Sequence, residues 1–561
     1  MQDFFLRYDC SGARRRTNER ETEGESRKAY SSLSLGDRGE VEIWGIESSG
    51  PYPVDIRQDS EGDTFVTYGE IRNPELFDFG EEPTSEGPAA MLAAGWRDEG
   101  VSFLERIRGP LAGVIWSARQ RRLLLFRHKL GLLPVFFYRR DHSLAVSSNP
   151  GLLLEHVDEE FVPNRRRLAA ALALSNDFGR EYFFEHVYRV RPREIIQWEL
   201  PSLRQRARYY WSLPDRRRSE SEGADAGELY RTLRESVEVL PDKPRWHALS
   251  GGLDSTTLAV LDYELSDRGR SETIVTGSMV TGEFPQADER RWIEMVLEAF
   301  PFENHQLDIS RNLPLSDLGE YEYGVEWGPA FMVDEVWWRA FFPFMKSRTG
   351  MSNFVLGLGG DRLFQIPRGR LLTTAMDADS IPELLGGIKR AFAGAGVRQI
   401  LSVIWQVLPR RLWSEPLHQL YEALRSSRPP WLRPGQWTSP GQFWSGVGSG
   451  ELDSSLDRNS LSNACFRLEM NGSWPMEKVL LSIQRRSRRN EIRFLCPMLD
   501  SELWELSSRF APSQLRDGSR QKMILREAVD NHVPDGLRLA DDHTDYAGLT
   551  DYALGIRYTD S

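Results

Sequence analysis

One hexapeptide constrains this chain more than any other segment: Ser250-Gly251-Gly252-Leu253-Asp254-Ser255. It stands between RWHAL, which is typical of a short strand, and TTLAVLDYEL, which is typical of a buried helix. The two glycines let the backbone approach an anion closely, and the start of the next helix offers N–H groups to it. Asp254 would repel a bare phosphate, so it fits only with a divalent cation such as Mg²⁺. The segment predicts a site for metal-bound phosphates; the alternative is a glycine turn with a serine cap.

A second glycine-rich segment follows another predicted strand, VLGL, and ends in an aspartate: Gly357-Leu358-Gly359-Gly360-Asp361. The two segments resemble the SGGLDS and G-x-G-[SG]-D-E-L-F motifs of asparagine synthetases, in the ATP-pyrophosphatase superfamily. In that family two aspartates hold Mg²⁺ on the ATP, and the resemblance transfers this role to Asp254 and Asp361. The nucleotide contacts that it implies are Ser250, Gly251, Gly252, Leu253, Asp254, Ser255, Met279, Gly357, Gly359 and Gly360.

The hydrophobic pattern changes along the chain. Residues 40 to 150 contain alternating apolar segments typical of short strands, with one helix expected over 89–106. After the polar segment 213–225, strands expected at 245–249, 272–280 and 353–358 alternate with helices expected at 255–267 and 288–300. This alternation predicts a doubly wound parallel α/β sheet. No internal repeat is present.

The N-terminal part resembles class II glutamine amidotransferases. YGEIRN at 68–73 is close to that family's NGEIYN, and RHKLGLLPVFFY is close to RDRLGIKPLYY. The resemblance implies an Ntn-type β-rich sandwich. We therefore predict a degenerate amidotransferase-like domain over 1–213, a linker over 214–225, and an ATP-pyrophosphatase domain over 226–561 with a helical insertion at 378–460.

Two parts of the glutaminase are replaced. That chemistry needs a cysteine directly after the initiating methionine, because its free α-amine assists the thiol. Gln2 occupies this position, and Cys10 is internal. Tyr68 replaces the asparagine of NGEIYN, which donates to the oxyanion. The domain is thus expected to make no ammonia, which leaves a substrate amine as the nucleophile.

The C-terminal segments EIRFLCPMLDSELWEL and RQKMILREAVDNHVP resemble lasso-peptide cyclases (macrolactam synthetases). Asparagine synthetases carry glutamate, and β-lactam synthetases tyrosine, where this chain has Leu358, which cannot move a proton. Relatives also carry a lysine near position 541, which is absent here; Lys522, Arg520 and His543 are the candidate replacements. Glu326 matches an acidic position that lines the acceptor pocket of relatives, and Leu358 is expected to line it as well.

Composition excludes several classes. A formal net charge of −12 makes a general nucleic-acid binder a poor fit, and no apolar run reaches the length of a membrane span. The N-terminus has no signal-peptide pattern, and the three cysteines form no CxxC pair, so we expect a cytoplasmic protein. The basic run at 485–489, RRSRR, is expected to be a solvated helix face.

The resulting hypothesis is an ATP- and Mg²⁺-dependent lasso-peptide cyclase. It would adenylate an Asp or Glu side chain of a precursor core peptide and join it to the N-terminal amine. A leader peptidase and a leader-recognition protein would be its partners. The alternatives are an asparagine synthetase-like or β-lactam synthetase-like ligase for a small molecule, and a catalytically inactive nucleotide-binding scaffold.

Overall fold

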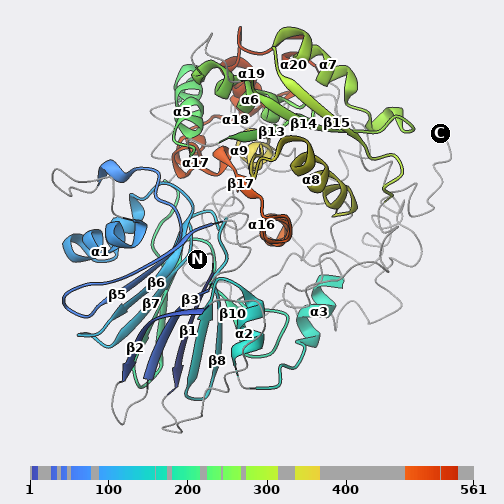
Figure 1. The fold of residues 1–561 in the computed structure, drawn as a ribbon. Helices are drawn as coiled ribbons and strands as arrows, with labels where there is room; N and C mark the ends of the chain where they lie inside the picture. The colour runs from blue at the N-terminus through green and yellow to red at the C-terminus, as the bar shows by residue number, and fades with distance from the viewer. Residues whose placement is uncertain are drawn as a thin grey trace, which may run out of the picture.

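A computed structural model describes residues 3–9, 27–34, 40–46, 52–76, 87–157, 159–172, 180–214, 224–241, 244–266, 273–313, 335–366, 474–518 and 520–540. A β-sandwich and a parallel sheet covered by helices lie one above the other in Figure 1. The insertion predicted at 378–460 lies outside the described residues, so it stays a prediction, as do the domain limits.

The sandwich consists of two antiparallel sheets of six strands each. The first sheet has the order β10-β8-β9-β1-β3-β2, from β1 (Asp3–Asp9), β2 (Arg27–Ser34), β3 (Glu40–Ile46), β8 (Phe136–Arg140), β9 (Ser143–Ser147) and β10 (Val187–Arg189). The second has the order β12-β11-β7-β6-β5-β4, from β4 (Val54–Gln58), β5 (Thr64–Gly69), β6 (Leu111–Ser117), β7 (Arg122–Phe126), β11 (Glu194–Glu199) and β12 (Arg204–Tyr209).

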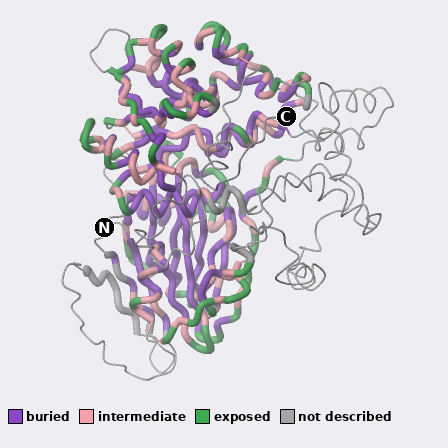
Figure 2. The backbone as a smooth tube through the Cα atoms, turned by 90° about the vertical axis from the view of Figure 1, so that its right-hand side faces the viewer, coloured by how far each residue is buried: buried purple, intermediate pink, exposed green. Residues whose placement is uncertain are grey.

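Successive side chains of each strand point to opposite faces of its sheet, and this explains how the two sheets pack. In β1, Phe4, Leu6 and Tyr8 point into the core between the sheets, whereas Phe5 packs on the outer side. The strands β5 and β6 are buried along their whole length because the helix α1 (Pro88–Glu99) covers the outer face of their sheet. Figure 2 shows this buried interior running through the strands.

The helix predicted at 89–106 is wrong in its length. The helix α1 ends where Gly100 adopts a φ of 63°, and a separate 3-10 helix, η3 (Ser102–Glu105), follows. A positive φ is readily adopted only by glycine, so Gly100 explains the break.

The third sheet is parallel, with the order β15-β14-β13-β16-β17. Its strands are β13 (Arg245–Ala248), β14 (Val275–Val280), β15 (Glu303–Asp308), β16 (Asn353–Val355) and β17 (Arg493–Leu495). The main helices around it are α5 (Ala226–Glu238), α6 (Leu253–Leu265), α7 (Arg290–Ala299), α8 (Glu335–Thr349) and α16 (Trp474–Asn490). The predicted fold class, a β-rich sandwich followed by a doubly wound parallel α/β domain, is confirmed.

The strand order reverses between β13 and β16, which are hydrogen-bonded neighbours. At such a point the loops that leave the two strands diverge to opposite faces of the sheet, and ligands of open α/β sheets bind there. The hexapeptide Ser250–Ser255 follows β13, and the second glycine-rich segment follows β16. The topology therefore brings the two predicted motifs together.

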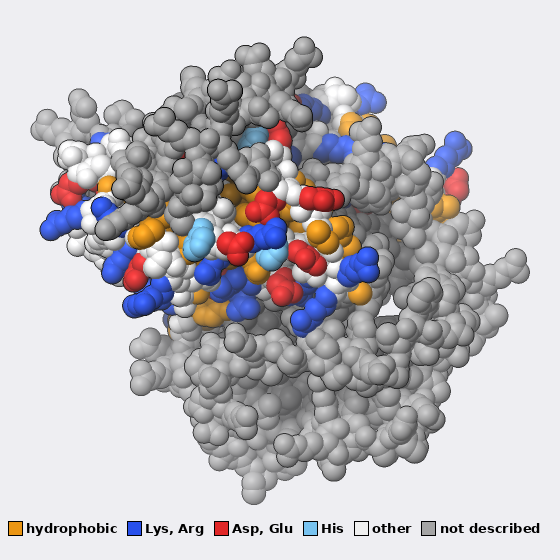
Figure 3. Space-filling model, turned by 90° about the horizontal axis from the view of Figure 1, so that it is seen from below, with side chains coloured by type: hydrophobic (Ala, Val, Ile, Leu, Met, Phe, Trp, Pro, Cys, Tyr) orange, Lys and Arg blue, Asp and Glu red, His pale blue; other side chains and the backbone are white. Residues whose placement is uncertain are grey.

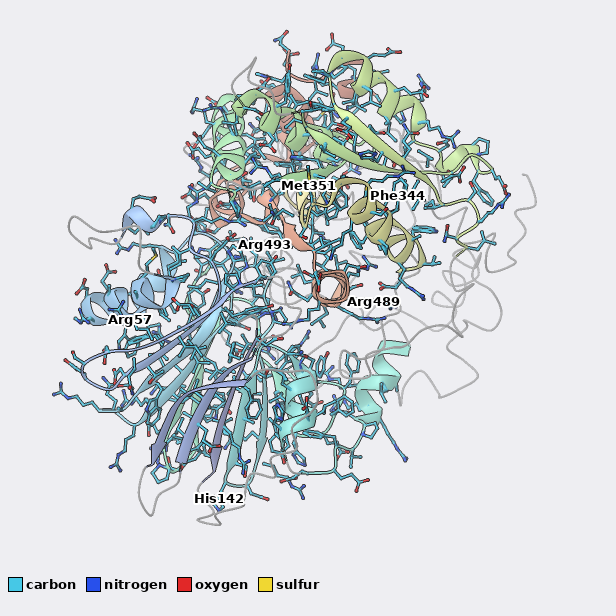
Figure 4. The ribbon with its side chains drawn as sticks, in the orientation of Figure 1. Arg57, His142, Phe344, Met351, Arg489 and Arg493 are labelled. Carbon is cyan, nitrogen blue, oxygen red and sulfur yellow. The ribbon has the colours of Figure 1, made fainter. Side chains whose placement is uncertain are left out.

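The helix α16 lies between the sandwich and the parallel sheet, and is seen nearly end-on in Figure 1. The expectation that its basic run faces solvent is wrong for Arg485, Arg486 and Arg488, which are 7%, 5% and 8% exposed. Of the arginines in this run, Arg489 alone is exposed. Arg486 pairs with Glu335 of α8 at 2.7 Å. Figure 4 labels Arg493, which follows this helix in the chain and begins β17, between the sandwich and the parallel sheet.

Short elements complete the description: η2 (Pro74–Leu76), α2 (Pro150–His156), α3 (Arg165–Leu172), η5 (Pro285–Ala287), α9 (Gly360–Phe364), η11 (Pro497–Leu499), α17 (Ser501–Ser507), α18 (Pro512–Leu515), β18 (Arg516–Asp517), β19 (Arg520–Gln521), α19 (Met523–Ala528) and α20 (Asp535–Arg538). Within the described part of the chain, no helix is both long and apolar enough to cross a membrane. On the face drawn in Figure 3, basic and acidic side chains intermingle over the described residues.

Candidate active site

The loop after β13 is held by its own two serines. Ser250 Oγ lies 3.0 Å from Ser255 Oγ and accepts a hydrogen bond from the Gly252 N–H at 3.3 Å. Ser255 Oγ also donates to the Gly252 carbonyl at 3.1 Å. These bonds fold the loop back over the first turn of α6, where the N–H groups have no partner within the helix. The serines therefore shape the loop at the start of α6, the position predicted to bind phosphates.

Gly251 is required by both conformation and space. Its φ is +69°, and a Cβ there would lie 2.5 Å from the Trp292 Cβ of α7. A side chain at this position would thus be strained and would collide with the neighbouring helix. Trp292 could not be predicted as a neighbour of this loop, because only the fold places α7 beside it.

The second loop packs directly on the first. Gly359 has a φ of +107° and precedes the short helix α9, whose first turn contains Asp361. A Cβ at Gly357 would lie 3.2 Å from the Asp254 Cβ, and one at Gly360 would overlap the Asp254 carboxylate. The glycines of this loop are what allow Asp254 and Asp361 to share one site.

Lys522 joins the two aspartates. Its Nζ lies 2.7 Å from Asp254 Oδ2 and 2.8 Å from Asp361 Oδ1. Burial by itself lowers the pKa of the Lys522 ammonium, but the two carboxylates outweigh it, so the net pKa lies above its usual value and the group stays protonated. The backbone of Lys522 is left-handed, with a φ of 60°, at the start of α19. Of the three candidate replacements for the missing lysine, the structure brings this one to the aspartates.

The other predicted site residues have varied placements. Arg520 lies two residues earlier, in β19, with an exposed side chain. Met279 is half-buried in β14, next to β13 in the sheet. Leu358 packs as a partly buried residue against the main core. Glu326 and His543 lie outside the described residues, so their roles stay predictions.

Comparison with known proteins agrees with this geometry. The profile of the family described as "Asparagine synthase" matches residues 228–540. The chain belongs to the asparagine synthase family. It is thus an ATP-dependent carbon–nitrogen ligase of the asparagine synthetase-like kind. A second profile, "Glutamine amidotransferase domain", matches residues 52–211.

Individual relatives of this asparagine synthase family member are distant. Asparagine synthetase 3 (glutamine-hydrolyzing) of Bacillus subtilis is 22% identical over 457 residues, which are 79% of this chain and 67% of that protein. Amidase chry2 of Gibberella zeae is 27% identical over 188 residues, 32% of this chain and 27% of its own. A solved structure of glutamine PRPP amidotransferase from Bacillus subtilis, complexed with ADP and GMP, matches with a TM-score of 0.21 and 12% identity, over 48% of this chain and 66% of that one. At that TM-score the likeness does not inform the fold.

The residues of this family member fit Mg²⁺ bound together with ATP. Asp254 and Asp361 meet at one cation, Lys522 Nζ, and the Asp361 side chain is 71% exposed. No cluster of three or more His, Cys, Asp or Glu side chains suited to a metal occurs in the described part of the chain. One or two carboxylates together with phosphate oxygens are typical ligands of Mg²⁺.

In the amidotransferase-like domain of this family member, other side chains enclose Tyr68, the residue at the position predicted for the oxyanion donor. Tyr68 is fully buried in β5. Its hydroxyl lies 3.4 Å from Gln484 Oε1 and accepts a hydrogen bond from Arg488 Nη2 at 3.2 Å. Both partners belong to α16, so side chains of the synthase domain fill the surroundings of this position.

Proposed function

We propose that this chain is an ATP-dependent lasso-peptide cyclase. The observation that carries the proposal is Leu358, a hydrophobic residue at the position of the family's proton-handling group, three residues before Asp361 in the same loop. A nucleophile that needs no base there is an amine that is already partly neutral. The α-amine of a peptide has a pKa of about 7.7–8.0, which meets this requirement near neutral pH.

The proposed reaction has two steps. An Asp or Glu carboxylate oxygen of the peptide bonds to the α-phosphorus of ATP, and the bond to pyrophosphate breaks. The peptide's N-terminal nitrogen then bonds to the acyl carbon, the carbon–oxygen bond to AMP breaks, and the amine loses a proton to solvent. The peptide loses one water overall, and ATP becomes AMP and pyrophosphate.

Residues of the chain bind and orient the reactants. The N–H groups at the start of α6, shaped by Ser250 and Ser255, bind the phosphates that leave as pyrophosphate. The protonated Lys522 compensates negative charge between the two aspartates. Mg²⁺, when held by Asp254 and Asp361, would neutralise phosphate charge.

The proposal includes partners as well. A ring that closes on a peptide's own N-terminus requires that end to be free, so a leader peptidase and a leader-recognition protein would act before this enzyme. The chemistry of the substrate supports this inference, because an amine within an uncleaved leader is an amide and is not nucleophilic.

A second function keeps specific support. The match to asparagine synthetase 3 of Bacillus subtilis extends over 79% of this chain, which favours an asparagine synthetase-like ligase for a small molecule. A catalytically inactive nucleotide-binding scaffold is the third alternative. All three alternatives bind ATP, so the experiment must identify which amine and which carboxylate become joined.

A leader-free peptide with a free N-terminus and an internal Asp or Glu tests the proposal. We expect a product lighter by one water, whose fragmentation locates the ring, and one AMP for each ring. The same peptide with an acetylated N-terminus should give no product but should still support carboxylate-dependent exchange of labelled pyrophosphate into ATP. Dehydration of the acetylated peptide, or turnover with only aspartate and ammonia, would refute the cyclase. ADP in place of AMP would refute the whole ligase mechanism.

A further inference from the structure

A buried ion pair joins the start of the chain's first strand to α16. The Asp3 carboxylate is fully buried and accepts hydrogen bonds from Ser148 Oγ and from Arg488 Nη2, each at 2.6 Å, and from the other terminal nitrogen of Arg488. The Arg488 side chain is 9% exposed. A charge buried without its partner is costly, so the pair holds α16 against the sandwich.

Tyr68 extends this contact. Its hydroxyl contacts both Arg488 and Gln484, and Gln484 Nε2 in turn donates to the Leu132 carbonyl at 2.9 Å. Burial raises the pKa of Tyr68 to about 12, so the hydroxyl remains neutral. The position that donates to the oxyanion in glutamine-hydrolysing relatives is here a fixed contact between the domains.

The chain that leaves α16 connects this contact to the nucleotide site. Directly after α16, β17 receives a second contact from the sandwich, because Tyr52 OH donates to the Phe494 carbonyl at 2.6 Å. The β17 residue Leu495 accepts a hydrogen bond from the Leu356 N–H at 2.9 Å. In the η11 turn that follows, the Met498 carbonyl lies so close to Gly359 that a Cβ there would be 2.9 Å from it. One short segment thus contacts the sandwich at one end and the Asp361 loop at the other.

We infer that Asp3, Arg488, Tyr68 and Tyr52 are positioning residues for the Asp361 loop. The sandwich, instead of supplying nitrogen, serves as a support that fixes α16 and β17 and thereby the second carboxylate of the ATP site. None of the four side chains acts on substrate; each acts through the backbone that runs from α16 through β17 to η11, which packs on Gly359. The inference rests on the proposed ATP-dependent function only for its binding measurement.

The test uses the full chain and the double variant Asp3→Asn/Arg488→Met, which removes both buried charges together and so avoids an unpaired ion. We expect near-parental melting, faster amide hydrogen exchange over residues 356–366, and about tenfold weaker binding of Mg²⁺ with a nonhydrolysable ATP analogue. Tenfold is the equilibrium equivalent of about one lost hydrogen bond. Arg106→Met is the control, because Arg106 forms an ion pair with Glu99 in the same domain but is 52% exposed.

Hydrogen exchange separates a positioning role from a purely structural one. If the four residues only stabilise the fold, a double variant that melts like the parent should also exchange amide hydrogens and bind the analogue like the parent. Parental exchange over residues 356–366 in a folded double variant would overturn the inference. If the double variant fails to fold, Tyr52→Phe decides the matter: it removes one hydroxyl, and we expect faster exchange over β17 and the Asp361 loop, whereas unchanged exchange at both overturns the inference. If the parental protein binds no analogue, the proposed function fails, and hydrogen exchange alone still judges the positioning role.

Discussion

Replacing Lys522 with methionine should show how far this cation offsets the negative charge of Asp254 and Asp361. Methionine keeps much of the length and apolar character of the side chain but removes the cation that lies 2.7 Å from Asp254 and 2.8 Å from Asp361. In the parent, Asp254 and Asp361 share the Lys522 ammonium; in the variant, the two carboxylates have no cation between them. In the absence of nucleotide and Mg²⁺, the folded protein must bear that repulsion.

The size of the effect follows from exposure. Lys522 and Asp254 are 10% and 15% exposed, so their contact is a buried pair, and removal of one partner of such a pair costs about 3–5 kcal/mol. Asp361 is 71% exposed, so its contact adds only about 0–1 kcal/mol. We therefore expect Lys522→Met to lower the free energy of unfolding by about 3–5 kcal/mol at pH 7, with the Asp254 contact dominant.

The pH dependence has a definite sign. The folded-state pKa of Lys522 is raised, so its stabilising contribution is complete below its ordinary pKa of about 10.4 and is lost only as the pH rises through the higher folded value. The difference between parent and variant should thus be constant from pH 7 to pH 9. Mg²⁺ should stabilise the variant more than the parent, because the metal replaces the lost cation.

Urea unfolding with and without Mg²⁺ measures all of these effects. The control is Lys346→Met, since Lys346 forms a pair of equal length, 2.7 Å, with Glu491, but the two side chains are 37% and 65% exposed. This control should lose no more than about 1 kcal/mol. If Lys522→Met unfolds like Lys346→Met, and Mg²⁺ affects parent and variant equally, Lys522 does not bridge the aspartates.

Three further predictions follow from individual contacts. Gly360→Ala should weaken binding of a nonhydrolysable ATP analogue at least tenfold, because the added methyl group displaces the Asp254 carboxylate; unchanged affinity by calorimetry would place that carboxylate elsewhere. Burial alone would raise the pKa of Asp262, but hydrogen bonds from Arg245 and His247 hold it below its usual range, so its stabilising contribution is present above about pH 4 and lost as the pH falls through the folded value. Asp262→Asn should therefore destabilise the protein at pH 7 and progressively less at lower pH, and a constant difference in urea unfolding between pH 7 and pH 2 would argue against this. Added glutamine should release glutamate only at the rate without enzyme, since Tyr68 replaces an oxyanion donor typically worth about 10²–10³ in rate, and measurable release would contradict the loss of glutaminase.

Local sequence was sufficient to predict where the two glycine-rich loops lie. The motif Ser250–Ser255 contains the turn, the two hydroxyl partners and the start of the helix, so the contacts that shape it lie within six residues. The strands β15 and β17 were missed for physical reasons. The strand β15 is the polar sequence ENHQLD at a sheet edge, and β17 is only three residues long, so neither carries a sufficient apolar pattern.

Long-range partners could not be predicted. Arg488 pairs with Asp3, which is 485 residues away, and nothing within RRSRR distinguishes a buried helix from a solvated one. Lys522 was one of several candidates, because its contact with Asp254 spans 268 residues and depends on a left-handed backbone at a non-glycine residue. Sequence periodicity reports neither of these features.

The edge position of β17 makes the sandwich indispensable for another reason. This strand is the last of the parallel sheet, hydrogen-bonded to β16 on one side, and Tyr52 of the sandwich covers its Phe494 carbonyl on the other. A synthase domain cut away from the sandwich would present this uncovered edge to a second molecule, and exposed edges template intermolecular pairing. Deletion of the N-terminal domain should therefore yield aggregates rather than a smaller enzyme. Protection against self-association would be a reason to retain this domain whether or not it hydrolyses glutamine.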